Sequence, residues 1–338
     1  MSTHPVIVIG AGIMGASITY HLAARGADVT LVDAGLPGSG ATRHSFGWIG
    51  RMPGDFSPAG DLRALGRHHW ERLAREVPGL EVHWSGALVW GEHFSSVGTG
   101  DGQAAVREPN LTSAPARSEF RPDDGWLNPV RATEKLISAA QENGASVRFG
   151  TPVTRLVSSR GDTVDGVELG SETLDASTVV VAAGIGSTAL CATAGRSLPM
   201  ISSPAIMVRL GASPGLVRGI VANDMFEARQ DVDGTVLIPL DYNTESSMED
   251  LMQVGMDARR LFVKSFKGAQ EAAVLSAEIG WRPMAADGEP KVGYSETPGL
   301  YIAVAHPGIT LASVIGDAAA EEILTQATRD ELAIYRLN

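Results

Sequence analysis

The stretch VIVIGAGIMGASITYHLAARGADVTLVDAG, from Val6 to Gly35, decides the fold of this chain. It opens with a continuous apolar run, Val6–Ile9, of the kind that forms a parallel strand buried on both faces. A glycine-rich turn and apolar residues at helical spacing follow, up to Gly26, and a second apolar run, Val29–Val32, ends at Asp33. Strand, glycine turn, helix, strand and acid in this order predict a Rossmann-like unit that binds a dinucleotide.

The three glycines of the turn each have a physical role. Gly10 permits the tight turn, Gly12 lets the backbone approach a pyrophosphate, and Gly15 lets the helix pack closely against the strand. The free N–H groups at the start of the helix, near Ile13, favour phosphate binding. Asp33 lies where a carboxylate accepts hydrogen bonds from ribose hydroxyls, and its charge would repel the 2′-phosphate of NADP.

The segment Gly38–Gly50, GSGATRHSFGWIG, bears on the choice between NAD and FAD. It is small, glycine-rich and hydroxyl-bearing, and it lacks the apolar helix with which an NAD domain usually continues. A loop of this kind suits an extended ligand whose pyrophosphate and ring system need close backbone approach. From the loop alone, a ligand-binding loop and an ordinary flexible loop are equally supported.

The overall composition narrows the classes of function. The 338 residues suffice for one large domain or two ordinary ones. A formal net charge of −12, from 27 basic and 39 acidic residues, disfavours a nucleic acid or an anionic membrane as partner. Cys191 is the only cysteine, so we expect no internal disulfide and no metal site of cysteine type. Because we also find no signal peptide and no bilayer-spanning apolar run, we expect a cytoplasmic protein without a metal.

Local signals predict further elements along the chain. Asn128 is suited to cap a helix that has Pro129 at its first position and ends at Gly144. The other predicted elements are strands at Gly86–Gly91, Val179–Ala182, Gly234–Leu240 and Gly299–Ala305, helices after Thr310 and at Ser247–Gly268, hairpins within Thr151–Asp175, and a loop at Ser95–Arg121.

Five segments, in order along the chain, carry a likeness to a known family. They are the opening unit, GATRHSFGWI (Gly40–Ile49), GWLNPVRATEKLISAAQENGASV (Gly125–Val147), VVVAAGIGS (Val179–Ser187), and GWRPMAADGEPKVG…GLYIAVAHPGITLASVIGDAAAEEIL (Gly280–Leu324). On these residues the chain resembles the D-amino-acid-oxidase-like family of FAD-dependent amine and amino-acid oxidases, which includes glycine oxidase and sarcosine oxidase.

The resemblance implies an α/β fold in which a Rossmann-like FAD-binding domain is interleaved with a smaller α+β substrate domain. The FAD-binding domain would comprise residues 1–80, 127–198 and 285–338. The substrate domain would comprise residues 81–126 and 199–284, and its mixed sheet would cover the flavin. The resemblance also implies FAD as the cofactor. Because the cysteine that attaches flavin covalently in sarcosine oxidase has no counterpart near His306, we predict noncovalent FAD.

The resemblance also assigns roles on the substrate side. Arg282, in GWRP, would lie at the open face of the flavin and bind a substrate carboxylate. Trp48 would reach the same side and exclude water, although a simple core position is an equal alternative. Arg51 is a candidate for a second cation, with a solvated loop residue as the alternative. Glycine oxidase has a carboxylate-binding tyrosine that aligns here with Met225, so Tyr242 is a candidate replacement.

The helix start at His306–Thr310 would point at the flavin pyrimidine, where a helix N-terminus stabilises the negative charge of reduced flavin. The FAD-binding residues that the resemblance implies are Gly10, Gly12, Ile13, Met14, Gly15, Asp33, Ala34, Ala41, Thr42, Arg43, His44, Phe46, Gly47, Trp48, Val153, Ala183, Gly184, Arg282, His306, Gly308, Ile309 and Thr310.

The expected activity is oxidation of a small amino acid or N-substituted glycine. Hydride would pass from the substrate Cα to flavin N5, and the imine would hydrolyse to a 2-oxo acid such as glyoxylate plus an amine, with O2 reduced to hydrogen peroxide. The missing tyrosine and the shorter turn HPGIT make the pocket less polar than in glycine oxidase, which disfavours free glycine. Alternatives left open are an opine- or proline-type dehydrogenase subunit with another electron acceptor, an idle FAD-binding protein, and an NAD-dependent dehydrogenase. A homo-oligomer is also left open.

Overall fold

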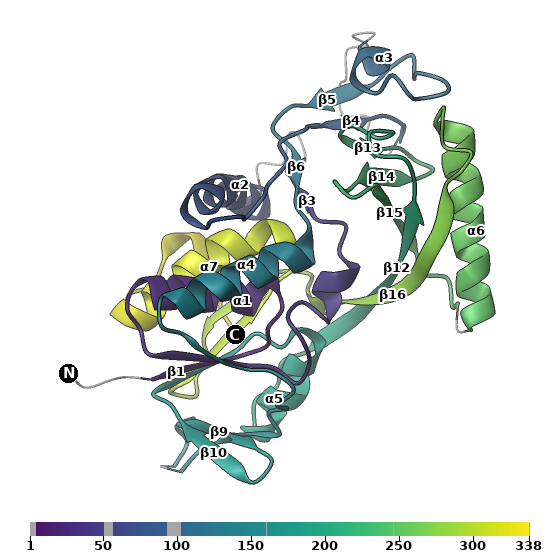
Figure 1. Cartoon of the computed structure of the whole chain (residues 1–338). Coiled ribbons are helices and arrows are strands. Elements are labelled where there is room, and N and C mark those ends of the chain that lie inside the picture. The colour runs from purple at the N-terminus through teal and green to yellow at the C-terminus, as the bar shows by residue number, and fades with distance from the viewer. Residues whose placement is uncertain (1–4, 51–56, 93–102, 160, 246, 338) are drawn as a thin grey trace.

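The computed structural model of the chain describes residues 5–50, 57–92, 103–159, 161–245 and 247–337. Its two large sheets lie toward opposite ends of the molecule (Figure 1). Two long strands, β12 (Met200–Gly211) and β16 (Ala273–Ala285), extend from one end toward the other. The predicted α/β class is confirmed.

The first sheet contains the strands of the opening unit. Its order is β17 (Lys291–Tyr294), β18 (Leu300–Val304), β11 (Thr178–Val181), β1 (Val6–Ile9), β2 (Val29–Val32) and β7 (Ser146–Arg148). All neighbours pair in parallel except β17 with β18. The central strands are buried on both faces, which explains their continuous apolar runs.

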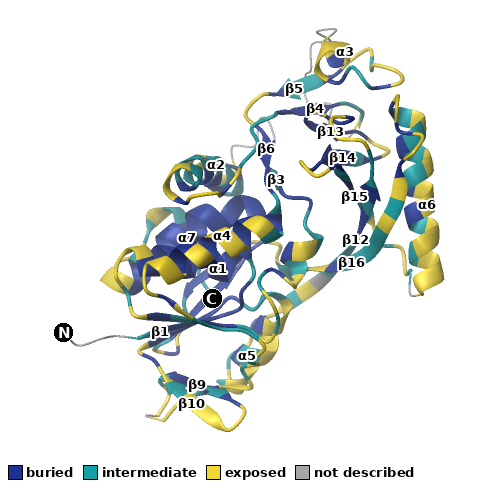
Figure 2. Cartoon of the chain, in the orientation of Figure 1, coloured by how far each residue is buried: buried dark blue, intermediate teal, exposed yellow. Residues whose placement is uncertain are grey.

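Helices cover one face of this sheet. They are α1 (Ile13–Ala24), α4 (Pro129–Glu142) and α7 (Gly308–Thr325), and α2 (Pro58–Glu76) packs on α7 (Figure 1). Helix α1 is buried almost throughout, whereas α4 is exposed on its outer side (Figure 2). Helices α1 and α7 pack so closely that a Cβ at Gly316 would lie 2.1 Å from the Ser17 hydroxyl. An all-round apolar helix such as α1 is therefore explained by burial on every side.

The other face of the first sheet packs on smaller elements. A three-stranded antiparallel sheet, in the order β10, β9 and β8, and α5 (Ser187–Thr193), which contains the buried Cys191, contribute to a core with this face. The strands are β8 (Arg155–Val157), β9 (Gly166–Leu169) and β10 (Glu172–Asp175), which agree with the predicted hairpins.

The second sheet is mixed, as predicted. Its order is β16, β12, β15 (Thr235–Asp241), β14 (Glu227–Gln230), β13 (Ile220–Ala222), β4 (Ala87–Val89) and β5 (Glu119–Arg121), and only β13 and β4 pair in parallel. Helix α6 (Met248–Ser265) covers its outer face. Its inner face packs on Phe46 and Trp48, from the segment that follows the first Rossmann unit.

Short elements join the two bodies. They are the 3-10 helices η1 (Ala41–His44) and η3 (Gly184–Gly186) and the strand pair β3 (Trp48–Ile49) and β6 (Gly125–Trp126), whereas the 3-10 helix η4 (Asp330–Tyr335) packs beside β17 of the first sheet. The fully buried Arg229 of β14 donates hydrogen bonds to the carbonyl oxygens of Phe46 and Leu127, and so ties the second sheet to this junction. The strands of the two sheets alternate along the chain in the expected order, while the domain boundaries stay a prediction.

Most local predictions hold. The Asn128 side chain accepts a hydrogen bond from the Arg131 N–H, and Gly144 follows α4 with a φ of +96°. The loop expected at Ser95–Arg121 contains, in its described part, α3 (Ala104–Arg107) and β5, because Phe120 and its neighbours complete the edge of the second sheet. In the described part of the chain, no helix combines the length and the apolar character needed to cross a membrane.

Candidate functional site

The glycine turn after β1 is built for close backbone packing. Gly10 has a φ of +110°, and a Cβ there would lie 2.4 Å from the carbonyl oxygen of Ala182. A Cβ at Gly15 would lie 1.9 Å from the carbonyl oxygen of Gly10. Both positions therefore require glycine, as the sequence predicted.

The N-terminus of α1 fits a phosphate group. Gly12 is the N-cap, has no side chain to cap the helix, and leaves first-turn N–H groups available to an anion. The Ile13 N–H donates to the Thr42 hydroxyl at 3.1 Å. A Cβ at Gly12 would lie 3.3 Å from the same hydroxyl, a tight contact, so glycine leaves more room over this turn than any other residue. The predicted residues Met14 and Ala41 belong to the same two elements.

We call the glycine turn and the N-terminus of α1 together the cradle. Asp33, which follows β2, lies at its edge, on the side where the ribose is predicted to bind. Its carboxylate accepts hydrogen bonds from the N–H groups of Ala11, at 2.5 Å, and Gly35, at 2.6 Å. The Asp33 carbonyl oxygen accepts the Thr151 N–H at 2.9 Å, which brings the chain leading to Val153 to this edge. Asp33 therefore has a structural role, and hydrogen bonding to ribose through the remaining carboxylate lone pairs stays a prediction. Ala34 is exposed beside it.

The loop after β2 returns to the glycine turn. The Gly38 N–H donates to the Ala11 carbonyl oxygen at 2.8 Å. The side chains of Arg43 and His44 lie 3.8 and 3.9 Å from the Glu278 carboxylate on β16. The resemblance implied both residues as FAD ligands, whereas in the fold their side chains contact the second sheet. Any contact of this part of the loop with FAD is therefore predicted for its backbone and not for these two side chains.

Trp48 is held from two sides. Its indole N–H donates to the Asp124 carboxylate at 2.8 Å, and its carbonyl oxygen accepts the Thr310 hydroxyl at 3.1 Å. Its ring packs edge-on against Phe46, with 6.2 Å between the ring centroids. Gly47 precedes it with a φ of +81°. Sequence reasoning missed Asp124, because residues 76 positions apart in the chain give no local signal of their contact.

The end of β11 and the strand β16 meet next to the glycine turn. A Cβ at Gly10 would lie 2.9 Å from the Ala183 Cα, and a Cβ at Gly184 would lie 3.9 Å from the Pro283 ring. Pro283 directly follows Arg282, so the fold brings this arginine to the edge of the cradle.

Arg282 is a half-buried guanidinium without an acidic partner among the described residues. Its Nε donates to the Ser203 carbonyl oxygen at 3.0 Å, and its Nη2 donates to the Ser203 hydroxyl at 2.8 Å. Arg282 is therefore not a surface arginine paired with an acid within the part of the chain that the structure describes. Two hydrogen bonds fix the guanidinium and leave its positive charge uncompensated, which suits it to bind an anion.

His306 lies near Arg282 at the start of α7. Burial and, to a smaller extent, the positive charges of Arg282 and Arg63 together lower its pKa to about 4. Gly308 begins α7, and the carbonyl oxygen of Ile309 accepts the Trp70 indole N–H at 2.8 Å. The imidazole is therefore neutral at physiological pH, and sequence reasoning missed the contribution of Arg63 to this region.

The geometry described so far is that of a dinucleotide cradle with a cation at its edge. A family model described as FAD dependent oxidoreductase matches residues 5–322. The chain belongs to this family of FAD dependent oxidoreductases. Its cofactor is FAD, and the free helix N-terminus and the obligatory glycines fit the pyrophosphate of that group. The enzyme is an FAD-dependent oxidoreductase that is similar to amino-acid and amine oxidases of the glycine oxidase type.

Two curated relatives and one solved structure illustrate this likeness. Glycine oxidase of Bacillus licheniformis is 26% identical over 361 residues, which cover 97% of this chain and 95% of that protein. The 4-methylaminobutanoate oxidase (formaldehyde-forming) of Paenarthrobacter nicotinovorans is 30% identical over 233 residues, which cover 62% of this chain but only 28% of that protein. The crystal structure of glycine oxidase from Geobacillus kaustophilus has a TM-score of 0.84 and 24% identity over 99% of each chain, which shows the shared fold.

In the fold of this FAD-dependent oxidoreductase, Tyr242 does not lie beside Arg282. Tyr242 packs with the core under α6, and its ring centroid lies 6.3 Å from that of Trp281. Trp281 and Arg282 are adjacent in β16, so their side chains point to opposite faces of the sheet. This placement corrects the expectation that Tyr242 replaces the missing tyrosine. Arg51, the other substrate-side candidate, lies outside the described residues.

The inner face of β14 instead presents Glu227. Met225, which alignment had placed at the tyrosine position, is 67% exposed in the turn before this strand. Glu227 pairs with Ala222, which belongs to the inner core together with Phe46 and Leu237. Cross-strand partners share a face, so Glu227 lies on the side of the cofactor-binding body. Sequence reasoning missed it because the sequence does not show that β14 begins at Glu227 or which face of the sheet this side chain takes.

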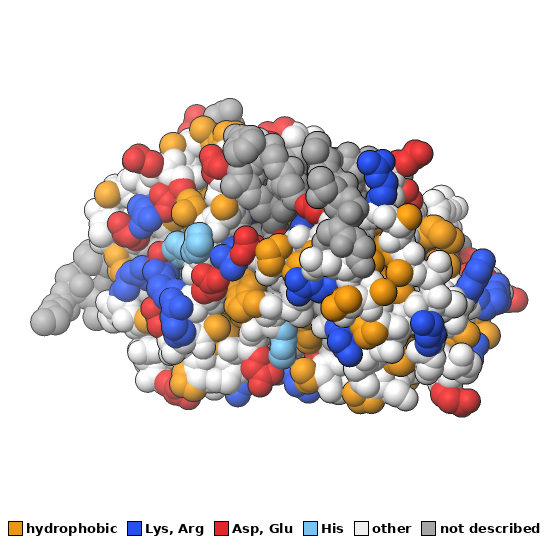
Figure 3. All heavy atoms as spheres, turned by 90° about the horizontal axis from the view of Figure 1, so that it is seen from above, with side chains coloured by type: hydrophobic (Ala, Val, Ile, Leu, Met, Phe, Trp, Pro, Cys, Tyr) orange, Lys and Arg blue, Asp and Glu red, His pale blue; other side chains and the backbone are white. Residues whose placement is uncertain are grey.

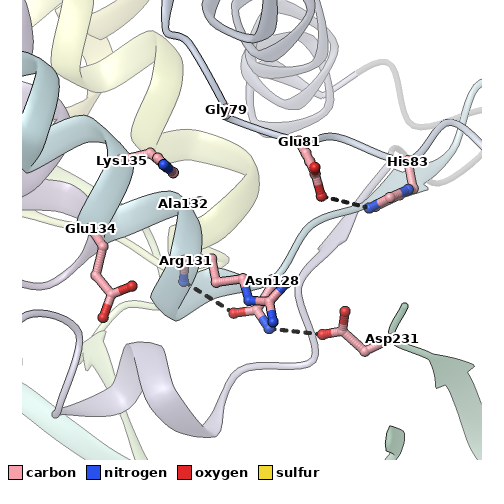
Figure 4. Close-up of a pocket in the computed structure, with 9 residues that line it drawn as sticks. All are labelled: Gly79, Glu81, His83, Asn128, Arg131, Ala132, Glu134, Lys135 and Asp231. Atoms are coloured by element: carbon pink, nitrogen blue, oxygen red, sulfur yellow. Dashed lines mark hydrogen bonds and ion pairs between the residues drawn. The ribbon is translucent and has the colours of Figure 1, made fainter. Parts of the chain in front are cut away.

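A pocket of about 410 Å³ lies elsewhere, beside the N-terminus of α4 (Figure 4). In it, the Asn128 amide donates to the Asp231 carboxylate at 2.8 Å, and His83 lies 3.9 Å from Glu81. None of its lining residues is a predicted FAD or substrate ligand. On the face in Figure 3, acidic and basic side chains are interspersed. Within the described part of the chain, no cluster of three histidine, cysteine or acidic residues is arranged to hold a metal ion.

Proposed function

We propose that this enzyme oxidises the Cα–N bond of a small amino acid or N-substituted glycine whose carboxylate binds Arg282. The observation that carries this proposal is the half-buried guanidinium that two hydrogen bonds to Ser203 fix at the edge of the cradle, with no acidic partner in the described part of the chain. A carboxylate placed there would have its Cα held in one orientation. Bound FAD supplies the acceptor for the hydride that leaves the Cα.

The residues around Arg282 support the same orientation. Trp48, fixed by Asp124 and Thr310, is suited to exclude water from the reacting carbon. The neutral His306 at the start of α7 adds no positive charge that would compete for the carboxylate, and the N-terminus of α7 favours the negative charge of the reduced cofactor. The product would be an imine, which water hydrolyses to a 2-oxo acid, such as glyoxylate, and an amine.

We further propose that O2 is the electron acceptor, reduced to hydrogen peroxide, and that FAD is held noncovalently. The only cysteine, Cys191, is fully buried in α5 within the core on the other face of the first sheet. Burial also raises the pKa of its thiol to about 11, so that it would remain an unreactive thiol.

The purified yellow protein tests this function directly. Under anaerobic conditions it would be mixed with glycine, sarcosine, longer N-carboxymethyl amines, proline and both enantiomers of common amino acids. At least one carboxylate-bearing amine is expected to bleach the flavin absorbance, and readmitted air is expected to restore it with release of hydrogen peroxide. A flavin that no such compound bleaches would contradict the proposed function, and bleaching without reoxidation by air would indicate a dehydrogenase.

A further inference from the structure

Glu227 is a charged side chain on the inner face of the second sheet that the proposed reaction does not use. It pairs with Ala222, and Arg229, two residues further on, pairs with Leu237 of the same inner core. Arg282 lies on this same face, because Glu278, four residues earlier in β16, pairs with the inner-core residue Met207. One face of one sheet therefore carries both Arg282 and Glu227.

The Glu227 carboxylate is uncompensated. Among the described residues it forms no ion pair and no hydrogen bond, although it is half-buried. Burial raises its pKa, and the nearby negative charge of Asp241, at the end of β15, raises it further. A carboxylate in such surroundings gains most from a cationic partner, because that partner offsets both the desolvation and the repulsion.

Among the residues that the structure describes, the inner face thus offers Arg282 as a positive group without an acidic partner and Glu227 as a negative group without a basic one. Arg282 suits a carboxylate, and Glu227 suits a cation. The reacting amine is a poor partner for Glu227, because a carboxylate stabilises the protonated ammonium, whereas hydride transfer requires the neutral amine. The chemically consistent partner is a different cationic group of the same substrate.

We propose, on the basis of the proposed function above, that Glu227 is a specificity-determining residue that selects substrates carrying a second, positively charged group besides the reacting amine and the carboxylate. Diamino carboxylic acids, guanidino acids and N-(aminoalkyl)glycines belong to this class. Neutral aliphatic amino acids of the same length lack the group that would pair with Glu227.

The test compares matched substrates in the full-length enzyme. Lysine and norleucine, each as both enantiomers, form one pair, and an N-(aminoalkyl)glycine and an N-alkylglycine of equal length form the other. In the wild-type enzyme the ratio of kcat/KM, cationic over neutral, is expected to be about 10 to 100, because a hydrogen bond to a charged group contributes about 1.5–3 kcal/mol.

The variant Glu227→Gln keeps the shape of the side chain and removes its charge. We expect it to bring the kcat/KM ratio close to 1, mainly through a higher KM for the cationic member of each pair. The matched control is Glu271→Gln, an exposed carboxylate outside the inner face, which should keep the wild-type ratio. Asp241→Asn, which removes the neighbouring charge, is expected to lower the ratio less than Glu227→Gln does.

The outcomes separate the two proposals. A wild-type enzyme that oxidises the neutral members at least as well as the cationic ones overturns the role of Glu227, even if Glu227→Gln fails to fold, and leaves the proposed function intact. A ratio that persists in Glu227→Gln overturns it as well. If no carboxylate-bearing amine bleaches the flavin, the proposed function itself fails, and the role of Glu227 fails with it.

Discussion

Arg282 and His306 show how single residues acquire a function from their surroundings. The guanidinium is fixed by Ser203 and has no acidic partner in the described part of the chain, so its charge is available. The imidazole nearby is kept neutral by burial and by two arginines. His306 would therefore carry a positive charge only at low pH, and at neutral pH the positive charge of this pair resides on Arg282.

Replacement of Arg282 by methionine removes the cation and keeps most of the side-chain volume. We expect kcat/KM for carboxylate substrates to fall about 100- to 1000-fold, because leaving a half-buried carboxylate unpaired costs about 3–4 kcal/mol. Steady-state kinetics with the best substrate of the anaerobic panel measures this loss. The FAD absorbance spectrum serves as the control and should be unchanged. Kinetics like those of the wild type would remove Arg282 from the substrate site.

The same substitution makes a second prediction, for His306. Removing the positive charge of Arg282 should raise the pKa of the imidazole from about 4, because one of the two charges that disfavour its protonation is gone. NMR titration of the histidine ring protons in both proteins checks this shift. An unchanged His306 would mean that Arg282 does not lie close to it.

At the scale of elements, the packing of α1, α2 and α7 depends on a buried acid. Asp317 of α7 is only 5% exposed and accepts a hydrogen bond from Arg25 at 2.5 Å, while Arg72 of α2 lies 3.1 Å away. Burial alone would raise the pKa of Asp317, but the Arg25 hydrogen bond and the surrounding positive charges outweigh it and lower the pKa to about 2. The three helices are thus held together through one carboxylate.

This arrangement predicts how stability depends on pH. The folded protein keeps Asp317 ionised down to about pH 2, whereas the unfolded chain protonates it near pH 3.8, so its contribution is complete above pH 4 and is lost as the pH falls through 2. Asp317→Asn should therefore lower the free energy of unfolding by about 2 kcal/mol at neutral pH and by much less at the acid end. Urea unfolding at several pH values measures this difference. The control Asp330→Asn changes an exposed acid and should have little effect on the free energy of unfolding. If the loss of that free energy in Asp317→Asn did not depend on pH, the explanation would be contradicted.

At the scale of the whole molecule, the cradle is assembled from distant parts of the chain. Four segments form it, and they come together only when the first sheet and its helices are complete: residues 10–15, 41–48, 183–184 and 306–310. The end of the chain is tied in as well, because Arg336 and the Tyr301 hydroxyl both bind the buried Glu322 carboxylate of α7. FAD should therefore bind the folded chain and not the unfolded one.

We expect added FAD to stabilise the apoprotein by mass action. At a free FAD concentration of 100 times Kd the gain is about 2.7 kcal/mol, which raises Tm by several degrees. Thermal unfolding of the apoprotein at increasing FAD concentrations measures it. ATP at the same concentrations is a control for general nucleotide effects. A Tm that does not change with FAD would contradict a cradle formed only in the folded state.

The sequence by itself determined the opening unit with its glycine turn and most helix ends. These depend on short-range rules: glycines where the backbone needs a positive φ or close approach, as at Gly10 and Gly15, a cap such as Asn128, and continuous apolar runs for buried strands. Local chemistry decides such features, so a single stretch of chain contains the information.

Only the tertiary structure decided which side chains share the site. In a strand, a shift of one residue turns a side chain to the opposite face, and strand pairing places Glu227 inside, Tyr242 against α6 and Met225 in an exposed turn. The contact between Asp124 and Trp48, and the gathering of arginines around Asp317, likewise join residues that lie far apart in the chain. Their proximity results from packing of complete elements, for which no local pattern exists.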